Sequence, residues 1–217
     1  AHECPGLLVG AGRRRRRRHH AVLDQRARHR ADLGLPPDRQ VVVYLGLLAD
    51  YQGVPQLLKA AALLRSQDVP VSFLVMGFPG VAAYSEQAAA LGLAAQDVVF
   101  TGKVPYDQAP AYLALGDVAV APKLSATEGS GKLLNYMSMA MPVVAFDTPV
   151  SREYMGEHGV YAPPGDVAAF AEALIALLDD PQRAASLGQQ LRQRAVDRYS
   201  WDWAGGQITN IYQGLLS

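Results

Sequence analysis

Gln40-Val-Val-Val-Tyr-Leu-Gly46 is the stretch that decides the fold. Its run of apolar side chains ends at a glycine, and a helical pattern over Val54–Arg65 follows closely. A strand that is apolar at every position, and not only at alternate positions, is buried on both faces. The stretch therefore indicates a parallel sheet that helices cover on both sides.

The same alternation of apolar runs and helical patterns continues downstream, without an internal repeat. It predicts an α/β domain with a Rossmann-like parallel sheet of about six strands and helices on both faces. The expected strands are Val41–Gly46, Val71–Met76, Asp97–Thr101, Asp117–Ala121, Pro142–Phe146 and Gly159–Tyr161, and the expected helices are Val54–Arg65, Val81–Leu91, Tyr106–Ala114, Lys132–Ala140, Ser151–Met155, Asp166–Asp179 and Pro181–Tyr199.

Charge divides the chain into two parts. The 217 residues carry 20 basic and 20 acidic side chains, but residues 1–30 hold nine arginines against two acids. We therefore expect a basic head without fixed structure at 1–39 and one domain at 40–217. The head is an interdomain linker, a cloning remnant or a stretch read in an unintended frame, or else a tail for nucleic acid or acidic membranes. The first group is favoured because the tail has no aromatic residue to stack on bases. The domain itself is acidic, so we expect no nucleic-acid partner.

Several classes of protein are excluded by what the sequence lacks. The apolar stretch Val41–Ala49 is too short to span a bilayer, and the order of charged and apolar residues near the start is wrong for a secretory signal. A single cysteine, Cys4, fits a reducing compartment, and we expect a cytoplasmic protein. Only His158 stands outside the head, in a turn where we expect it to be an exposed loop residue, and no Asp-x-Asp occurs. No metal site is therefore expected.

One loop has the composition of an anion site. In Pro122–Lys132, Gly129 and Gly131 allow a tight turn, and a helix is expected to begin directly afterwards. Free amides and the dipole at a helix N-terminus attract anions, and an anion would also explain a lysine in the first helical turn. The alternative interpretation is a turn that only packs the helix against the sheet.

Several motifs in order point to a known family. The segment from about Val41 to Leu216 resembles the C-terminal, donor-binding domain of a retaining glycosyltransferase of family 4, which would make it one half of a GT-B fold. The motifs that carry the resemblance are Val43-Tyr-Leu-Gly46 with Gly53, Val99-Phe-Thr-Gly-Lys-Val104, Tyr112 before Gly116-Asp-Val-Ala-Val-Ala-Pro122, Glu128-Gly-Ser-Gly131, Asn135-Tyr-Met with Pro142-Val-Val-Ala145, Pro164-Gly-Asp166 and Tyr199-Ser-Trp201.

The resemblance implies transfer of a sugar from a UDP- or GDP-linked donor with retention, without a metal or other cofactor. Glu128 would be the catalytic-site residue that holds the donor sugar, and Asn135 would face the ribose. The diphosphate would lie on backbone amides of the glycine turn and of the start of the following helix. The implied donor-binding residues are Gly46, Gly102, Lys103 and Val104 (the last three at the base), Lys123, Gly129, Ser130, Gly131, Lys132, Leu133 and Asn135.

The sequence departs from the family pattern at the first loop. Leu47 and Gln52 stand where the family commonly has an arginine and a lysine that clamp the diphosphate. Lys123 and Lys132 could take over this role, the alternative being that both are solvated surface lysines. Asn135 replaces the second of two family glutamates, and six residues separate it from Glu128, where the family has seven.

The resemblance covers only one half of such an enzyme. We expect a partial glycosyltransferase whose N-terminal acceptor domain is absent, so that any contact with a membrane surface would come through the absent half. The alternatives are a non-catalytic nucleotide-sugar-binding or partner module of the same fold and, disfavoured by the position of His158, a nucleotide-sugar epimerase. Trp201 and Trp203 are expected to anchor the terminal helix against the core, with sugar stacking as the alternative.

Overall fold

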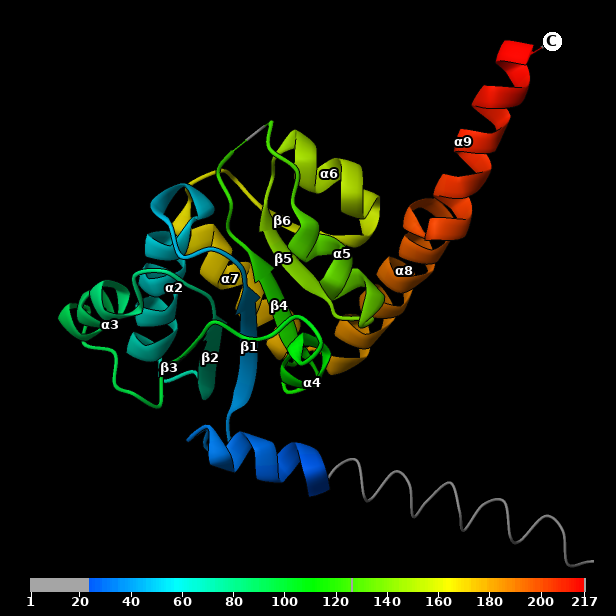
Figure 1. The fold of residues 1–217 in the computed structure, drawn as a ribbon. Helices are drawn as coiled ribbons and strands as arrows, with labels where there is room; N and C mark the ends of the chain where they lie inside the picture. The colour runs from blue at the N-terminus through cyan, green and yellow to red at the C-terminus, as the bar shows by residue number, and fades with distance from the viewer. Residues whose placement is uncertain (1–23, 126, 217) are drawn as a thin grey trace, which may run out of the picture.

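The computed structural model of the chain describes residues 24–125 and 127–216. Its centre is a parallel sheet with the strand order β3-β2-β1-β4-β5-β6 (Figure 1). Each of the six expected strands is confirmed, with bounds that agree to within one residue. The strands are β1 Gln40–Leu45, β2 Val71–Met76, β3 Val98–Gly102, β4 Val118–Ala121, β5 Val143–Phe146 and β6 Val160–Ala162.

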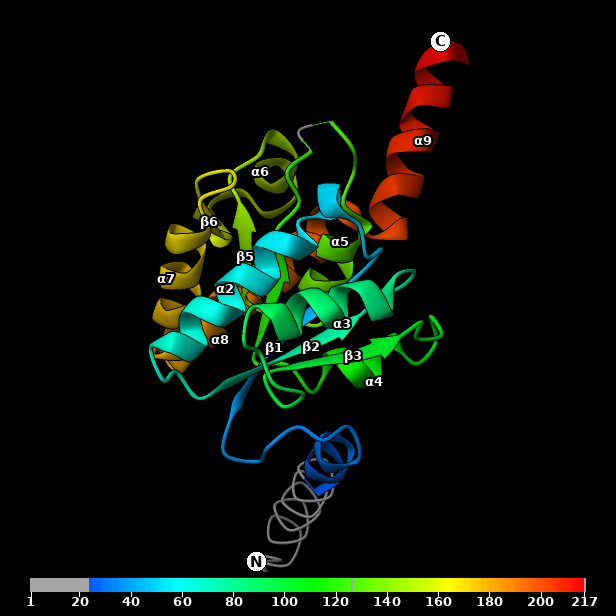
Figure 2. The ribbon, with the colours of Figure 1, turned by 90° about the vertical axis from the view of Figure 1, so that its left-hand side faces the viewer.

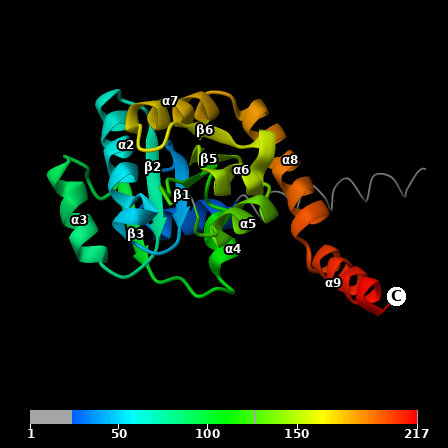
Figure 3. The same ribbon diagram turned by 90° about the horizontal axis from the view of Figure 1, so that it is seen from above.

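Helices cover both faces of the sheet, as the apolar strands predicted (Figure 3). One layer contains α2, α3 and α7, and the other contains α4, α5, α6 and α8. The helices are α2 Val54–Ser66, α3 Val81–Ala90, α4 Ala109–Leu113, α5 Gly131–Ser138, α6 Pro149–Met155, α7 Val167–Leu178, α8 Pro181–Tyr199 and α9 Trp201–Leu216, with short 3-10 turns η1 Asp50–Gln52 and η2 Gly156–His158.

Alternate side chains of each strand fill two separate cores. In β1, Val42 and Tyr44 pack under α2, α3 and α7, whereas Val41 and Val43 pack under α4, α5 and α8. All four are at most 1% exposed. This two-sided burial is the reason that the strand sequence shows no polar alternation.

The expectation of an unstructured head is wrong for its last part. Residues 24–32 form a helix that lies below the amino ends of the strands (Figure 1). Arg26 and Arg30 both bind Asp117, at 2.7 and 2.9 Å, and Arg30 also donates to the carbonyl of Leu115. The arginine run at 13–18 lies outside the described residues.

The expected packing of the two tryptophans is also wrong. Trp201 is 91% exposed and Trp203 is 46% exposed. They lie on α9, which extends away from the sheet (Figures 1 and 2). This helix was not among the expected elements, because Gly205 and Gly206 in its middle have low helix propensity.

Candidate functional site

The carboxyl ends of β1 and β4 meet in the middle of the sheet, and their loops interlock there. Gly53 has φ of +80°, and a Cβ at this position would lie 1.8 Å from the carbonyl oxygen of Pro122. Only glycine permits this approach of the two loops. The approach brings η1, which follows β1, next to the segment 122–131 that leads into α5.

The N-terminus of α5 presents unused hydrogen-bond donors. Ser130 is the N-cap residue, but its hydroxyl makes no capping bond and is buried without a partner among the described residues. The backbone amides of Ser130, Gly131 and Lys132 also have no partner in the described part of the chain. Leu133 does not fit the expectation, because its amide donates to the carbonyl of Ser130 at 3.0 Å and its side chain is in the core.

Lys123, which was expected to help clamp a phosphate, is engaged by the loop before α5. Its ammonium group donates to the carbonyl oxygens of Glu128 and Gly129, at 3.0 and 2.9 Å, and pairs with Oε2 of Glu128 at 2.6 Å. An ammonium has three donors, and all three are thus engaged. The side chain is 6% exposed, so Lys123 is neither a solvated surface lysine nor a free cation. It holds the loop and the carboxylate of Glu128 in place.

Lys132 reaches from α5 back to the end of β1. Its Nζ donates to Oε1 of Gln52 at 3.0 Å and lies 4.1 Å from the ring centroid of Tyr44. A Cβ at Gly46 would lie 2.8 Å from this nitrogen, so the glycine makes room for the amine. Burial lowers the pKa of Lys132 to about 7, with a smaller contribution from the charge of Lys123.

A second group of predicted residues lies at the end of β3. Gly102 has φ of +72°, and Nζ of Lys103 lies 5.1 Å from the ring centroid of Phe78, which follows β2. Phe78 is 46% exposed, and the sequence did not single it out. No contact tests the expectation that Gly102, Lys103 and Val104 line a base pocket, so this stays a prediction.

Asn135 and Gly131 line a hollow of about 680 Å³ between α5, α8 and the start of α9. Tyr106, from the loop that follows β3, also lines it and is 82% exposed. The hollow therefore adjoins the N-terminus of α5 on the side where Asn135 was expected to meet a ribose.

Comparison with known proteins agrees with these features. A family model described as "Glycosyl transferases group 1" matches residues 39–180, more than half of the chain. The chain belongs to the group 1 glycosyl transferases.

Among curated proteins, this glycosyl transferase chain is 34% identical to a GDP-mannose-dependent alpha-(1-6)-phosphatidylinositol monomannoside mannosyltransferase of Mycolicibacterium smegmatis. The match covers 88% of this chain and 52% of that protein, so the chain spans about half the length of the relative. A match over 88% of the chain is longer than the segment from residue 39 to residue 217. The similarity therefore extends upstream of residue 39, into the segment that the family motifs did not cover.

Solved structures show the same fold. HepE of Anabaena, determined in complex with UDP, is 21% identical, with a TM-score of 0.77 over 88% of this chain and 53% of that one. The C-terminal domain of the group 1 glycosyl transferase LpcC of Francisella tularensis is 18% identical, with a TM-score of 0.68. It covers 81% of this chain, and this chain covers 93% of it. The expectation of a C-terminal domain of GT-B type is thus confirmed.

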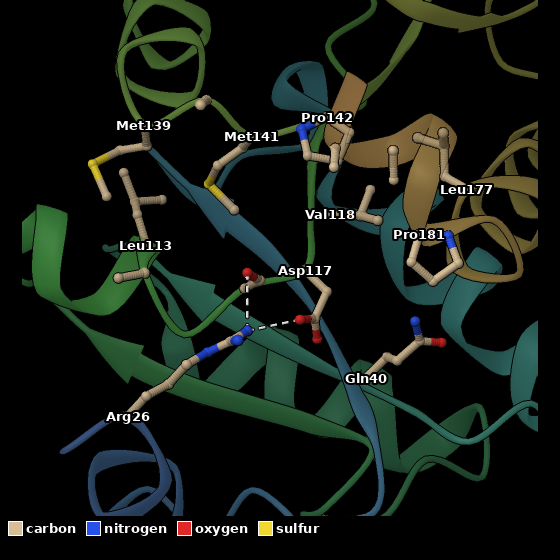
Figure 4. Close-up of a pocket in the computed structure, with 15 residues that line it drawn as sticks. Arg26, Gln40, Leu113, Asp117, Val118, Met139, Met141, Pro142, Leu177 and Pro181 are labelled. Carbon is tan, nitrogen blue, oxygen red and sulfur yellow. Dashed lines mark hydrogen bonds and ion pairs between the residues drawn. The ribbon is translucent and has the colours of Figure 1, made fainter. Parts of the chain in front are cut away.

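The glycosyl transferase domain has another cavity, of about 410 Å³, at the amino ends of the strands (Figure 4). Arg26 lines it, and hydrogen bonds to Asp117 and to the carbonyls of Leu115 and Gly116 hold this side chain. In open α/β sheets, ligands bind at the opposite, carboxyl edge. We therefore assign this cavity to the attachment of the N-terminal helix.

Within residues 24–125 and 127–216, no group of three or more His, Cys, Asp or Glu side chains is placed to hold a metal ion. No helix in the described part of the glycosyl transferase chain is both long and apolar enough to cross a membrane. His158 lies in η2, partly buried.

Proposed function

We propose that the chain is the donor-binding part of a retaining glycosyltransferase that takes its sugar from a nucleotide sugar. The observation that carries the proposal is the buried hydroxyl of Ser130, left without a partner beside three free amides at the N-terminus of α5. A buried unsatisfied hydroxyl costs about 1–3 kcal/mol, so a ligand that accepts its hydrogen bond explains it. A diphosphate has the negative charge that the helix dipole favours.

These donors suit the charge that develops in the reaction. As the bond between the anomeric carbon and the diphosphate oxygen breaks, negative charge gathers on the diphosphate. The acceptor's hydroxyl oxygen bonds to the anomeric carbon on the same face, and its proton passes to the departing diphosphate. Each fixed donor to such an oxyanion contributes about 3 kcal/mol to lowering the barrier. Donors that are already in place need no reorganisation during the reaction. The positive end of the α5 dipole can stabilise the departing diphosphate without a metal ion.

Glu128 is placed to hold the donor sugar. Lys123 fixes its carboxylate through Oε2, and half of the Glu128 side chain is exposed towards solvent. The carboxylate can accept hydrogen bonds from sugar hydroxyls, while Asn135 can bond a ribose hydroxyl from the adjoining hollow. The acceptor would be bound by a further domain, such as the other half of the longer relatives provides.

The test is calorimetric titration of the chain with UDP-glucose and, separately, GDP-mannose, each with and without EDTA. We expect one of the two to bind, unaffected by EDTA. Ser130→Ala should weaken binding about tenfold, equivalent to about 1.4 kcal/mol, because it removes one donor. The same variant should not lower the free energy of unfolding, because it also removes a buried unsatisfied group.

Ser66→Ala is the matched control, since Ser66 lies exposed at the end of α2. It should leave binding unchanged. The proposal is wrong if the folded chain binds neither nucleotide sugar, or if Ser130→Ala binds as well as the unmodified chain.

A further inference from the structure

The amine of Lys132 has mostly neutral surroundings, so that gaining or losing its proton near neutral pH requires little free energy. Gly46 leaves room for Nζ at the end of β1, the ring of Tyr44 covers it, and Gln52 accepts one of its hydrogen bonds. None of these neighbours carries a negative charge. An amine that is partly buried in this way, with a neutral hydrogen-bond acceptor and no bonded carboxylate, loses its proton more readily than a solvated lysine, and its pKa is lowered to about 7.

The other lysines of the chain are in different situations. Lys123 has all three donors engaged by the loop that it holds. Lys103 lies over the exposed ring of Phe78, and Lys59 is exposed on α2. Lys132 is therefore the lysine that combines a place on the anion-binding turn with unused donors among the described residues.

Charged and titratable groups face Lys132 from several elements. Lys123 and Glu128, from the segment before α5, oppose one another in their effect, the lysine lowering the pKa of Lys132 and the glutamate raising it. Tyr44 of β1 and Tyr136 of α5 stay neutral through the physiological range, because burial raises the pKa of each phenol. Burial thus acts in opposite directions here: it keeps both phenols neutral and lowers the pKa of the amine to about 7.

We propose that Lys132 takes up a proton when the diphosphate of a nucleotide sugar binds, and that Gln52 positions the amine to do so. This inference rests on the proposed function. The diphosphate brings negative charge next to the amine, so the charged form of Lys132 is favoured in the complex. The donor thereby generates its own cationic clamp, at the position where the family's permanent basic pair is replaced by Leu47 and Gln52.

Gln52 is a positioning residue in this scheme. It is 8% exposed and lies in η1, so its amide oxygen is fixed relative to Lys132. A neutral acceptor holds the amine without fixing its charge. A carboxylate at the same position would keep Lys132 protonated in the free protein and would repel the diphosphate.

The experiment measures proton uptake directly. The full chain is titrated calorimetrically with UDP-glucose and with GDP-mannose, in pairs of buffers that differ in ionisation enthalpy, at pH 5.5, 7.0 and 8.5. Both phosphates of a nucleotide sugar are diesters, so they lack the ionisation near pH 6 that a terminal phosphate has. We expect uptake near zero at pH 5.5, about half a proton at pH 7.0, and close to one at pH 8.5.

Variants assign the proton to its site. Lys132→Met should abolish the uptake and weaken binding at least tenfold, whereas Lys132→Arg should abolish the uptake but keep most of the affinity, because arginine stays charged. Gln52→Glu should bring the uptake at pH 7 close to zero, and the control Lys59→Met should behave like the unmodified chain.

Each outcome is decisive. Binding without proton uptake at pH 7.0 and 8.5, or uptake that persists in Lys132→Met, overturns this inference and leaves the proposed function standing. Failure of both nucleotide sugars to bind the folded chain overturns the proposed function and the inference together.

Discussion

Lys123 allows the sharpest test of how the loop before α5 is held. Lys123→Met keeps most of the apolar stem but leaves two partly buried carbonyl oxygens, of Glu128 and Gly129, without their donor. Hydrogen bonds from a charged donor contribute about 1.5–3 kcal/mol each. The ion pair to the carboxylate adds at most about 1 kcal/mol, since Glu128 is 54% exposed on its side chain. The free energy of unfolding should therefore fall by at least about 3 kcal/mol.

Glu128→Gln is the matched variant, because it removes only the ion pair and keeps both carbonyl contacts of Lys123. It should lower the free energy of unfolding by about 1 kcal/mol or less. Urea unfolding curves measure both values. Calorimetry with UDP adds a second readout: the dissociation constant should rise about tenfold in Lys123→Met, because the donors at 130–132 lose their fixed position, and less than twofold in Glu128→Gln. Equal destabilisation by the two variants would refute the reasoning, since it would reduce Lys123 to an ion pair.

Three further changes test other parts of the structure. Gly53→Ala should lower the unfolding free energy by more than about 3 kcal/mol because its Cβ meets the Pro122 carbonyl, whereas Gly102→Ala, with a similar φ but nothing within 4 Å, should cost about 1–2 kcal/mol in the same urea assay. Burial raises the pKa of Asp97, but hydrogen bonds from two arginines and a backbone amide lower it below its usual range. The stability from this carboxylate should thus be complete above about pH 5 and be lost as the pH falls below 4, and urea midpoints of Asp97→Asn should show a shallower decline over that interval. Asp117→Asn should weaken the hold on the N-terminal helix and speed tryptic cleavage at the arginines within it, without a matching change at the arginines of α8.

The sequence was sufficient to predict the sheet, because the side chains on both faces of each strand pack into a core and the strands are therefore apolar runs. It was also sufficient to place the glycine turn before α5, since glycines before a helix with a lysine in its first turn form a local pattern. It did not reveal the N-terminal helix, whose attachment depends on arginine contacts to Asp117 and not on apolar periodicity.

The contacts of Lys123 and Lys132 could not be predicted from the sequence, for a different reason. A lysine that binds backbone carbonyls, as Lys123 does, has the same sequence signature as a free cation. Gln52 and Tyr44 became part of the site only through contacts between segments about 80 residues apart in the chain. Leu133 lies in a helical turn whose first amides are free, but its own amide is already used within that turn.

The acidic balance of the domain remains to be reconciled with an anionic ligand. A permanent cation at position 52 would stand about 3 Å from the amine of Lys132, at the distance that the Gln52 oxygen occupies, and would oppose its charging. We therefore interpret Gln52 and Lys132 together. The permanent cation expected in the first loop is replaced by a lysine on α5 whose charge depends on ligand binding. The neutral amides and dipole of α5 supply the rest of the positive potential without adding to the net charge. An anion site of this kind needs few permanently charged basic residues, because binding of the diphosphate causes Lys132 to take up a proton.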